Sequence, residues 1–478
     1  MRNGKIVLGK YHADLRWIVV AFVLLLALGP MAVAQSPKVL TLEEAVDFAL
    51  KNYPAVRASL ERVRAAQAGI GLARTSYLPR ADMLWQTNRA TDNNITGLLL
   101  PQSVIAPITG AVTLSPSNQS AWGSAAGLLF SWEPFDFGYR GARVDAARAV
   151  RNRANAESSL TRLDVAVATV NAYLTVLAAE QTVHAADADV QRRETFQKAV
   201  RVLVDNQLRA GADASRADAE LARARVNLAR ARQQEQISKA ALADILGIAD
   251  TPVEVSAGSV VGPPPEASIQ SSALAAHPAA QVEQARINEA AAQIHALDRA
   301  YYPKFYFQSA VFGRASGFAP AGNFLGGTNG LGLDRSNWAV GVTVTFPLFD
   351  IFTIRSRKAI ESANERAEAA RYDQTLQDLT GQLRKAQASL EGARHVAENT
   401  PVELQAARTT EDQERSRYQA GLATLVEVAD AQSLLVQAET DDALARLAVW
   451  QNLAAVAAAQ GDLQPFLQFL HDKTQGGP

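Results

Sequence analysis

The sequence predicts a mainly α-helical protein with a small transmembrane β part, internally duplicated along the chain. Three observations carry this prediction. Short motifs recur 210 to 224 residues apart, long segments show heptad-like apolar spacing, and four segments alternate with a period of two. The expected architecture is an α-barrel of very long antiparallel helices, joined to four strands per chain that complete an oligomeric β-barrel.

Composition excludes several classes of protein. The 478 residues carry a formal net charge of −1 with no block of like charge, so a nucleic-acid partner, which needs a basic face, is not expected. The chain has no cysteine, which rules out disulfides, thiolate zinc sites, a catalytic thiol and an acylated cysteine anchor. None of its six histidines pairs with another at zinc spacing, and no nucleophile–base set is visible. We therefore expect no enzyme activity, no metal and no cofactor.

Residues 1–34 are predicted to be a cleaved secretory signal peptide. A basic start is followed by an apolar run of 12 residues from Trp17 to Leu28, and Ala32-Val33-Ala34 forms a cleavage site. The alternative is a membrane anchor, but a spanning helix needs about 20 apolar residues. Cleavage after Ala34 would leave Gln35 as the first residue of a protein exported from a bacterial cytoplasm. No other segment has 18 uninterrupted apolar residues, so any membrane crossing would use strands.

The repeat divides the chain into two halves. Matching motifs begin at residues 49 and 273, 77 and 301, and 135 and 349, and two Ala-Gly pairs end at Gly211 and Gly421. We expect a first repeat at 41–258, a Pro-rich connector at 259–267, a second repeat at 268–465 and a short C-terminal tail at 466–478. Each repeat should contain a helix, two strands, a very long helix, a break and a returning helix.

The first helix of the first repeat has a clear start signal. Thr41 followed by Glu44 three residues later forms a capping box, and the helix is expected to run toward Tyr77 and to end before Pro79. In the second repeat, Tyr302-Pro303 marks the corresponding exit.

The strand pattern is clearest at residues 338–346. Trp, Val, Val, Val and Phe fall on one face of WAVGVTVTF, whereas Ala, Gly and two Thr fall on the other. Residues 122–132 show the same alternation, and residues 81–89 and 304–313 show it more weakly. A bulky apolar face opposite a small face is typical of a transmembrane barrel strand, and the alternative is a soluble sandwich strand. Because a closed barrel needs about eight strands, several chains must contribute, and three would give twelve.

The segments that follow the strands predict helices of unusual length. Apolar residues recur with spacings of three and four from Leu160 to Leu177 and again from Leu376 to Leu390, and about 70 residues would span roughly 100 Å. Gly211 and Gly421 are expected to end these helices in left-handed caps. The returning helices should begin at Asp213 or Ser215, and near Thr424, where Glu427 completes a capping box. Pro401 predicts a kink or a restart within the second long helix.

An ordered set of motifs links these elements to a known family. The set comprises Arg417 to Gly421 followed by VEVAD at 426–430, QLRAG at 207–211 followed by Ala217-Asp218, the Tyr-Leu-Pro and Phe-Asp strand borders, and NAYL at 171–174. The chain beyond the signal peptide resembles the TolC-like outer-membrane efflux proteins. The resemblance implies a homotrimer with a twelve-strand barrel in outer-membrane lipid and a twelve-helix tunnel in the periplasm. A periplasmic adaptor protein and an inner-membrane pump would open its closed tips.

The resemblance also assigns roles to residues at the second tip. Glu427 and Asp430 are three residues apart and share one face of a helix. By resemblance they point into the closed aperture, where six carboxylates from three chains would raise each other's pKa and favour cations. The alternative is a capping box at Glu427 and a solvated Asp430. Tyr418 matches a family tyrosine that ties neighbouring helices together in the closed state.

Two positions depart from the family pattern. Ala423 and Ala217 stand where the family's latch arginine and acid would be, so Asp213, Arg216 or Asp218 would have to substitute, or the closed state is looser. The expected adaptor-docking residues are Ala210, Gly211, Ala420, Gly421 and Leu422. A plainer interpretation makes these residues turn formers only, and both can hold together.

These expectations combine into one functional hypothesis. The protein would be the outer-membrane channel of a tripartite efflux or type I secretion system, located in the outer membrane of a Gram-negative-type bacterium and extending into the periplasm. The alternative is a periplasmic coiled-coil adaptor or scaffold without a pore, which would not need strands with lipid-facing aromatic residues. The sequence identifies neither the exported substrate nor the class of pump.

Overall fold

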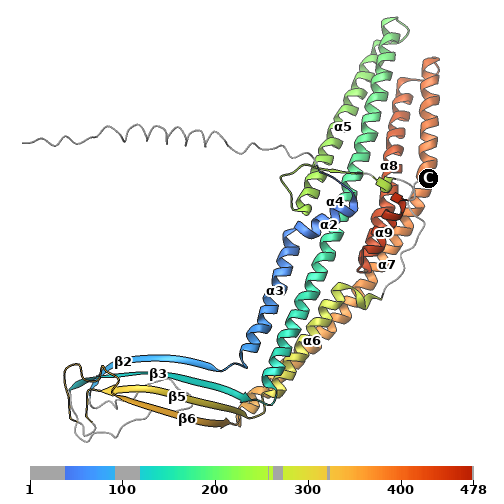
Figure 1. Cartoon of the computed structure of the whole chain (residues 1–478). Helices are drawn as coiled ribbons and strands as arrows, with labels where there is room; N and C mark the ends of the chain where they lie inside the picture. Colours follow the sequence, from blue (N-terminus) through green and yellow to red (C-terminus); the bar gives the residue numbers. More distant parts are fainter. Residues whose placement is uncertain (1–37, 92–118, 257, 262–272, 320–322, 476–478) are drawn as a thin grey trace, which may run out of the picture.

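The computed structural model describes residues 38–91, 119–256, 258–261, 273–319 and 323–475. A four-stranded sheet lies at one end of the molecule and the tips of very long helices lie at the other (Figure 1). The mainly helical architecture with a small β part therefore agrees with the predicted fold class. The predicted signal peptide falls outside the described residues.

All four predicted strands are present and form one antiparallel sheet. They are β2 (Arg80–Thr91), β3 (Ser120–Phe135), β5 (Lys304–Ser316) and β6 (Arg335–Thr345). The order is β2-β3-β5-β6, so within the described residues the outer edges of β2 and β6 have no strand partner. Bulky apolar side chains cover one face and are largely exposed, including Met83 at 83%, Trp85 at 82% and Trp338 at 76%. An apolar exposed face and open edges are what a chain needs if it contributes part of a barrel in lipid.

Each strand continues into a helix, so the order of the helices follows that of the strands. The helices are α3 (Pro54–Thr75), α4 (Tyr139–Asp205), α6 (Pro278–Arg299) and α7 (Asp350–Gln419). They pack side by side in the order α3-α4-α6-α7 (Figure 1). Nearer the tips, α5 (Gly211–Leu246) and α8 (Leu425–Ala459) replace α3 and α6, and the order becomes α5-α4-α8-α7. The chain is therefore a curved wall one helix thick.

The largest hydrophobic core lies between these two levels of the wall. Small elements gather there: β1 (Lys38–Leu40), α2 (Leu42–Asn52), β4 (Val253–Val255), η1 (Gly258–Val261), η2 (Leu274–Ala276) and α9 (Gln464–Gln475). Tyr173, Trp450 and Phe466 are fully buried in this core. The Tyr173 hydroxyl donates to the carbonyls of Leu40 (2.9 Å) and Ser256 (2.6 Å), which ties α4 to the parallel β1–β4 pair. By composition α4 contains one stretch apolar enough to cross a membrane, and half of that stretch is buried in the chain.

The first predicted helix is interrupted, contrary to expectation. The capping box of Thr41 and Glu44 is confirmed, but α2 ends at Asn52 and α3 begins at Pro54. Proline has no amide hydrogen and disfavours helical geometry in the residue before it, and Tyr53 has an extended ψ of 129°. The structure thus starts a new helix at proline.

Pro401 does not restart α7, which runs without interruption from Asp350 to Gln419. The adjacent residue Thr400 is 6% exposed, and its hydroxyl donates to Asp442 of α8 (3.1 Å). This buried contact stabilises the helical turn at Pro401, which lacks an amide hydrogen.

Candidate functional site

The two tips of the chain end in the same backbone motif. At the second tip, Leu422 donates to the Arg417 carbonyl (2.8 Å) and Gly421 has a φ of 78°. At the first tip, Leu208 donates to the Leu203 carbonyl (2.8 Å) and Gln207 has a φ of 63°. Both are Schellman caps, in which a residue with positive φ lets the last helical carbonyls find donors. The residue equivalent to Gly421 is therefore Gln207, 214 positions earlier.

This equivalence corrects the prediction for Gly211. Gly211 has no left-handed conformation and is the first residue of α5, after Ala210 at the N-cap. The returning helix thus starts earlier than Asp213 or Ser215, because the reversal is already complete at Gln207. The prediction for the second tip is confirmed: Thr424 caps α8, and Glu427 completes the capping box.

A small apolar core joins the two tips. Its buried members are Phe196, Val200, Ala217, Tyr418, Ala423, Leu425 and Val428. Ala217 is 4% exposed and Ala423 is 6% exposed, so the two positions expected to carry latch charges are methyl groups in this core. A polar latch at those two positions is therefore replaced by apolar packing.

Tyr418 is the centre of the contacts between the tips. Its side chain is 1% exposed and its ring meets the Phe196 ring edge-on at 5.3 Å. Its hydroxyl donates to Asp213 (3.3 Å), which is one of the three proposed substitute partners. Burial, and then the charge of Asp213, raises the pKa of Tyr418. The Arg209 guanidinium lies over the Tyr418 ring, 4.4 Å from the ring centroid, and donates to the Tyr418 carbonyl at 2.6 Å.

The other two candidate partners do not reach Tyr418. Asp218 accepts hydrogen bonds from Arg201 (2.8 Å) and Gln197 (2.7 Å), and these bonds lower its pKa. Arg216 is exposed. Of the three, only Asp213 therefore takes part in the contact between the tips.

Glu427 and Asp430 are both exposed in the single chain. Glu427 accepts from the Thr424 amide (2.6 Å) and hydroxyl (2.9 Å), and these two bonds lower the pKa of Glu427. The buried side of this turn is formed by Leu425, Val428 and Ala429, so both carboxylates lie on the side turned away from the tip core. The cap and an aperture role are compatible, because capping leaves the carboxylate in solvent.

The predicted docking residues lie at the end of the molecule farthest from the sheet (Figure 1). All five are exposed: Ala210, Gly211, Ala420, Gly421 and Leu422. The 214-residue equivalence adds one residue that the sequence analysis missed. Leu208 is 69% exposed and corresponds to Leu422, which is 72% exposed. The Phe-Asp motifs at residues 135 and 349, also 214 apart, were the signal that could have aligned the two tips.

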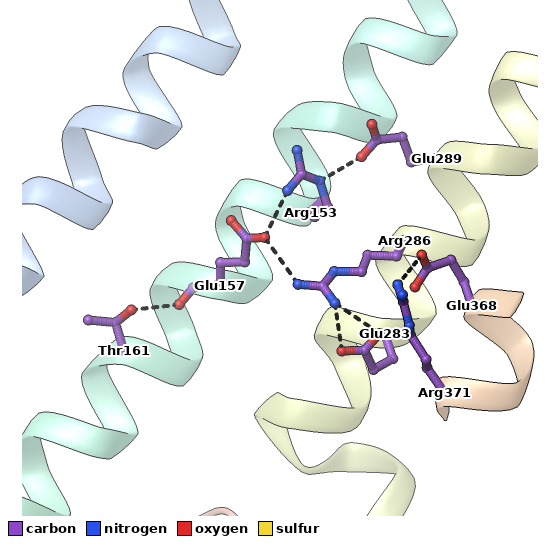
Figure 2. A network of polar contacts seen from close by, with 8 residues as sticks. All are labelled: Arg153, Glu157, Thr161, Glu283, Arg286, Glu289, Glu368 and Arg371. Atoms are coloured by element: carbon purple, nitrogen blue, oxygen red, sulfur yellow. Dashed lines mark hydrogen bonds and ion pairs between the residues drawn. The ribbon is translucent and has the colours of Figure 1, made fainter. Parts of the chain in front are cut away.

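The described residues contain no group of His, Asp or Glu arranged to hold a metal ion. Many of their charged side chains form ion pairs, some within one helix and some between helices. In one network Arg153 of α4 donates to Glu289 of α6 (2.6 Å) and to Glu157 (2.8 Å), while Arg286 of α6 pairs with Glu283 (3.0 Å) and lies 4.0 Å from Glu157 (Figure 2). Such pairs hold a thin wall together where it has little apolar core.

Comparisons with known proteins agree with this geometry. The family model described as outer membrane efflux protein matches residues 45–248 and 269–462. Protein CyaE of Bordetella pertussis is 28% identical over 89% of this chain and 84% of its own length. The pyoverdine export outer membrane protein OpmQ of Pseudomonas putida is 24% identical over 87% and 84%. The crystal structure of the Campylobacter jejuni CmeC outer membrane channel shares the fold with a TM-score of 0.70 at 17% identity, covering 91% of this chain and 89% of that one.

The chain belongs to the outer membrane efflux protein family. It is an outer-membrane channel for efflux or secretion that extends into the periplasm, and the family is one of channel proteins rather than enzymes. The predicted family, function and localisation are thereby confirmed.

Proposed function

We propose that three copies of this chain form a passive exit duct that is closed at the helix tips and opened by a periplasmic adaptor and an inner-membrane pump. The observation that carries the proposal is the open four-stranded sheet, whose strand order is continued by the helix order. Lipid leaves no water to satisfy an open strand edge, so β2 of one chain needs β6 of another. Three chains give twelve strands and a matching ring of twelve helices at each level.

The hand of the fold supports an assignment of the inner side of the wall. Trp122 lies on the same face of β3 as the exposed Leu128, and its carbonyl accepts from Gly317 (2.8 Å) on the β5 side. For an L-residue in a descending strand, a side chain that points to the viewer has its carbonyl on the viewer's left. Seen from the apolar face with the sheet uppermost, α6 therefore lies to the left of α4.

The same hand sorts the side chains of α4. Ser158 points to α3, because its hydroxyl lies 2.9 Å from that of Ser59. A right-handed helix turns about 100° per residue, so Glu157 and Arg153 lie on the side opposite the apolar face, and Asn155 lies on the same side as that face. The ion-pair network of Figure 2 then lines the duct, and its paired charges keep the lining wet.

The same rotation per residue, applied to α8, supports the predicted orientation of the gate carboxylates. Asp442 of α8 faces α7, because it accepts from Thr400 (3.1 Å). Counting back along the ascending helix at about 100° per residue turns Glu427 and Asp430 toward the inner side. Three chains would then bring six carboxylates together where the duct is narrowest. Their concentrated negative charge attracts cations, which predicts cation selectivity and block by multivalent cations.

The tips supply the surface for the partners. Leu208 and Leu422 are exposed beside small residues, which lets the end of another helical hairpin approach closely. We expect the adaptor to dock at these tips and the duct itself to perform no catalysis. The choice of cargo would belong to the pump.

The test is single-channel conductance in a planar bilayer. Wild type should give small cation-selective steps, and Glu427→Gln/Asp430→Asn should give larger steps with weaker selectivity. Asp412→Asn is the matched control, since it removes an exposed carboxylate near the same tip that pairs with Arg415 of its own helix. A double variant identical to wild type would move the gate elsewhere. Folded protein that reaches the outer membrane and never conducts would contradict the duct itself and favour the adaptor or scaffold alternative.

A further inference from the structure

The two tips differ at the position that follows the exposed leucine of each cap. Counting from the left-handed residue of each cap, Leu208 matches Leu422 and Arg209 matches Ala423, each 214 residues apart. Helix α5 starts at Gly211 and helix α8 starts at Leu425, which keeps the same offset. The second tip therefore has a buried methyl group at the position where the first tip has an arginine.

Arg209 reaches from the first tip across to the second. Its guanidinium stacks over the Tyr418 ring at 4.4 Å and donates to the Tyr418 carbonyl at 2.6 Å. It also lies against the turn itself, since a Cβ on Gly421 would be 3.9 Å from Arg209 Nη2. The carbonyls at the end of α7 carry the negative end of the helix dipole, so a cation is favoured there. A planar guanidinium can stack and donate at the same time, which an ammonium does less well.

Asp213 completes the contact at the hydroxyl of Tyr418. It lies in the first turn of α5 and accepts from the Tyr418 hydroxyl at 3.3 Å. The α4–α5 hairpin thus contacts Tyr418, in the last turn of α7, at the ring face, the backbone carbonyl and the hydroxyl. The α7–α8 hairpin cannot turn away from the α4–α5 hairpin without breaking all three contacts.

We infer that Arg209 is the positioning residue that holds the α7–α8 hairpin against the α4–α5 hairpin and so sets how firmly the duct is closed. The inference rests on the proposed function, because it assigns the tie that must break when the tips separate. It explains how the chain holds its tips together with alanine at positions 217 and 423.

The experiment measures the fraction of time that single channels stay open. Arg209→Met keeps much of the apolar volume and removes the charge. We expect it to raise the open fraction about tenfold, because a cation–π contact and a charge-assisted hydrogen bond are lost together. Arg209→Lys should give an intermediate rise. Arg201→Met is the matched control: Arg201 pairs with Asp218 within the first hairpin and does not reach the second.

A second variant separates a specific contact from general loosening. Tyr418→Leu removes the ring on which Arg209 stacks but keeps the backbone carbonyl to which Arg209 donates, so adding Arg209→Met to it should have a smaller effect than in the wild-type background. An open fraction that is unchanged in Arg209→Met, or that rises equally in Arg201→Met, would overturn the inference. Equal effects of Arg209→Met in both backgrounds would also overturn it. Wild-type trimers that never conduct would instead refute the proposed function.

Discussion

Replacement of Tyr173 by phenylalanine should loosen the middle of the molecule by a measurable and local amount. The Tyr173 side chain is fully buried, and its hydroxyl is shared between the carbonyls of Leu40 (2.9 Å) and Ser256 (2.6 Å). Leu40 keeps a second donor, the Ser256 amide at 3.0 Å, whereas the Ser256 carbonyl loses its hydroxyl donor. A part-buried carbonyl left without its donor costs about 1–2 kcal/mol.

That cost should appear as faster local opening of the β1–β4 pair. A change of about 1–2 kcal/mol corresponds to roughly 5- to 30-fold faster amide exchange where an opened segment closes again faster than its amides exchange. The assay is native-state hydrogen exchange with mass spectrometry, read at residues 38–40 and 253–255. Tyr372→Phe is the control, because Tyr372 is half-buried on α7 and its hydroxyl has no hydrogen bond within the described part of the chain. Exchange that is unchanged in Tyr173→Phe, or equally fast in the control, would refute the reasoning.

Three further predictions follow from single contacts. Pro401→Ala should slow amide exchange around residues 398–404, because the new amide can donate to the carbonyl four residues earlier; unchanged exchange would show that α7 is not weakened there. His277 caps α6 through Ala279, and burial lowers its pKa below that of the unfolded chain, near 6.5. Its contribution to stability is therefore present above about pH 6.5 and lost as the pH falls below it, so thermal unfolding at pH 7.5 and 5.5 should differ less in His277→Asn than in wild type. Asp136→Ala should cost about 3–5 kcal/mol in chemical denaturation, because it strands Arg140, whose side chain is 6% exposed beside a carboxylate at 2.9 Å; a cost below 1 kcal/mol would mean that water reaches the pair.

The strands and long helices could be predicted because their signals are periodic and local. Alternation at residues 338–346 needs only the side chains of one strand, and its bulky members are the exposed ones in the sheet: Trp338, Val340 and Val342. Heptad-like spacing in the same way predicts that a helix packs along one seam. Such patterns are reliable because many residues of the segment contribute to the same signal.

The prediction for Gly211 was wrong because a single backbone angle determines where the chain reverses at each tip. Gly211 and Gly421 look equivalent by residue type, but the equivalent conformation is at Gln207, a non-glycine residue with a φ of 63°. Residue type alone does not reveal such a choice, since tertiary packing determines it. The contact of Arg209 with Tyr418 joins positions 209 residues apart and lies beyond any local pattern. The gate residues remain predictions, because their task would depend on neighbouring chains.

The uneven burial of the helices explains why assembly and folding should be coupled in this protein. Helix α8 buries 17 of its 35 residues within the chain, whereas α7 buries 7 of its 70. Along α7 the apolar residues Ile360, Val396 and Val402 are 54–69% exposed, and on one side of α7 the described chain places no helix. A 70-residue helix with so little burial gains too little from its own chain to offset the entropy of ordering it. We propose that a neighbouring copy supplies the missing contacts, with its α3 and α5 forming the next part of the wall. The open strand edges lead to the same conclusion from the opposite end of the molecule, so the sheet and the helices should become stable in the same assembly step.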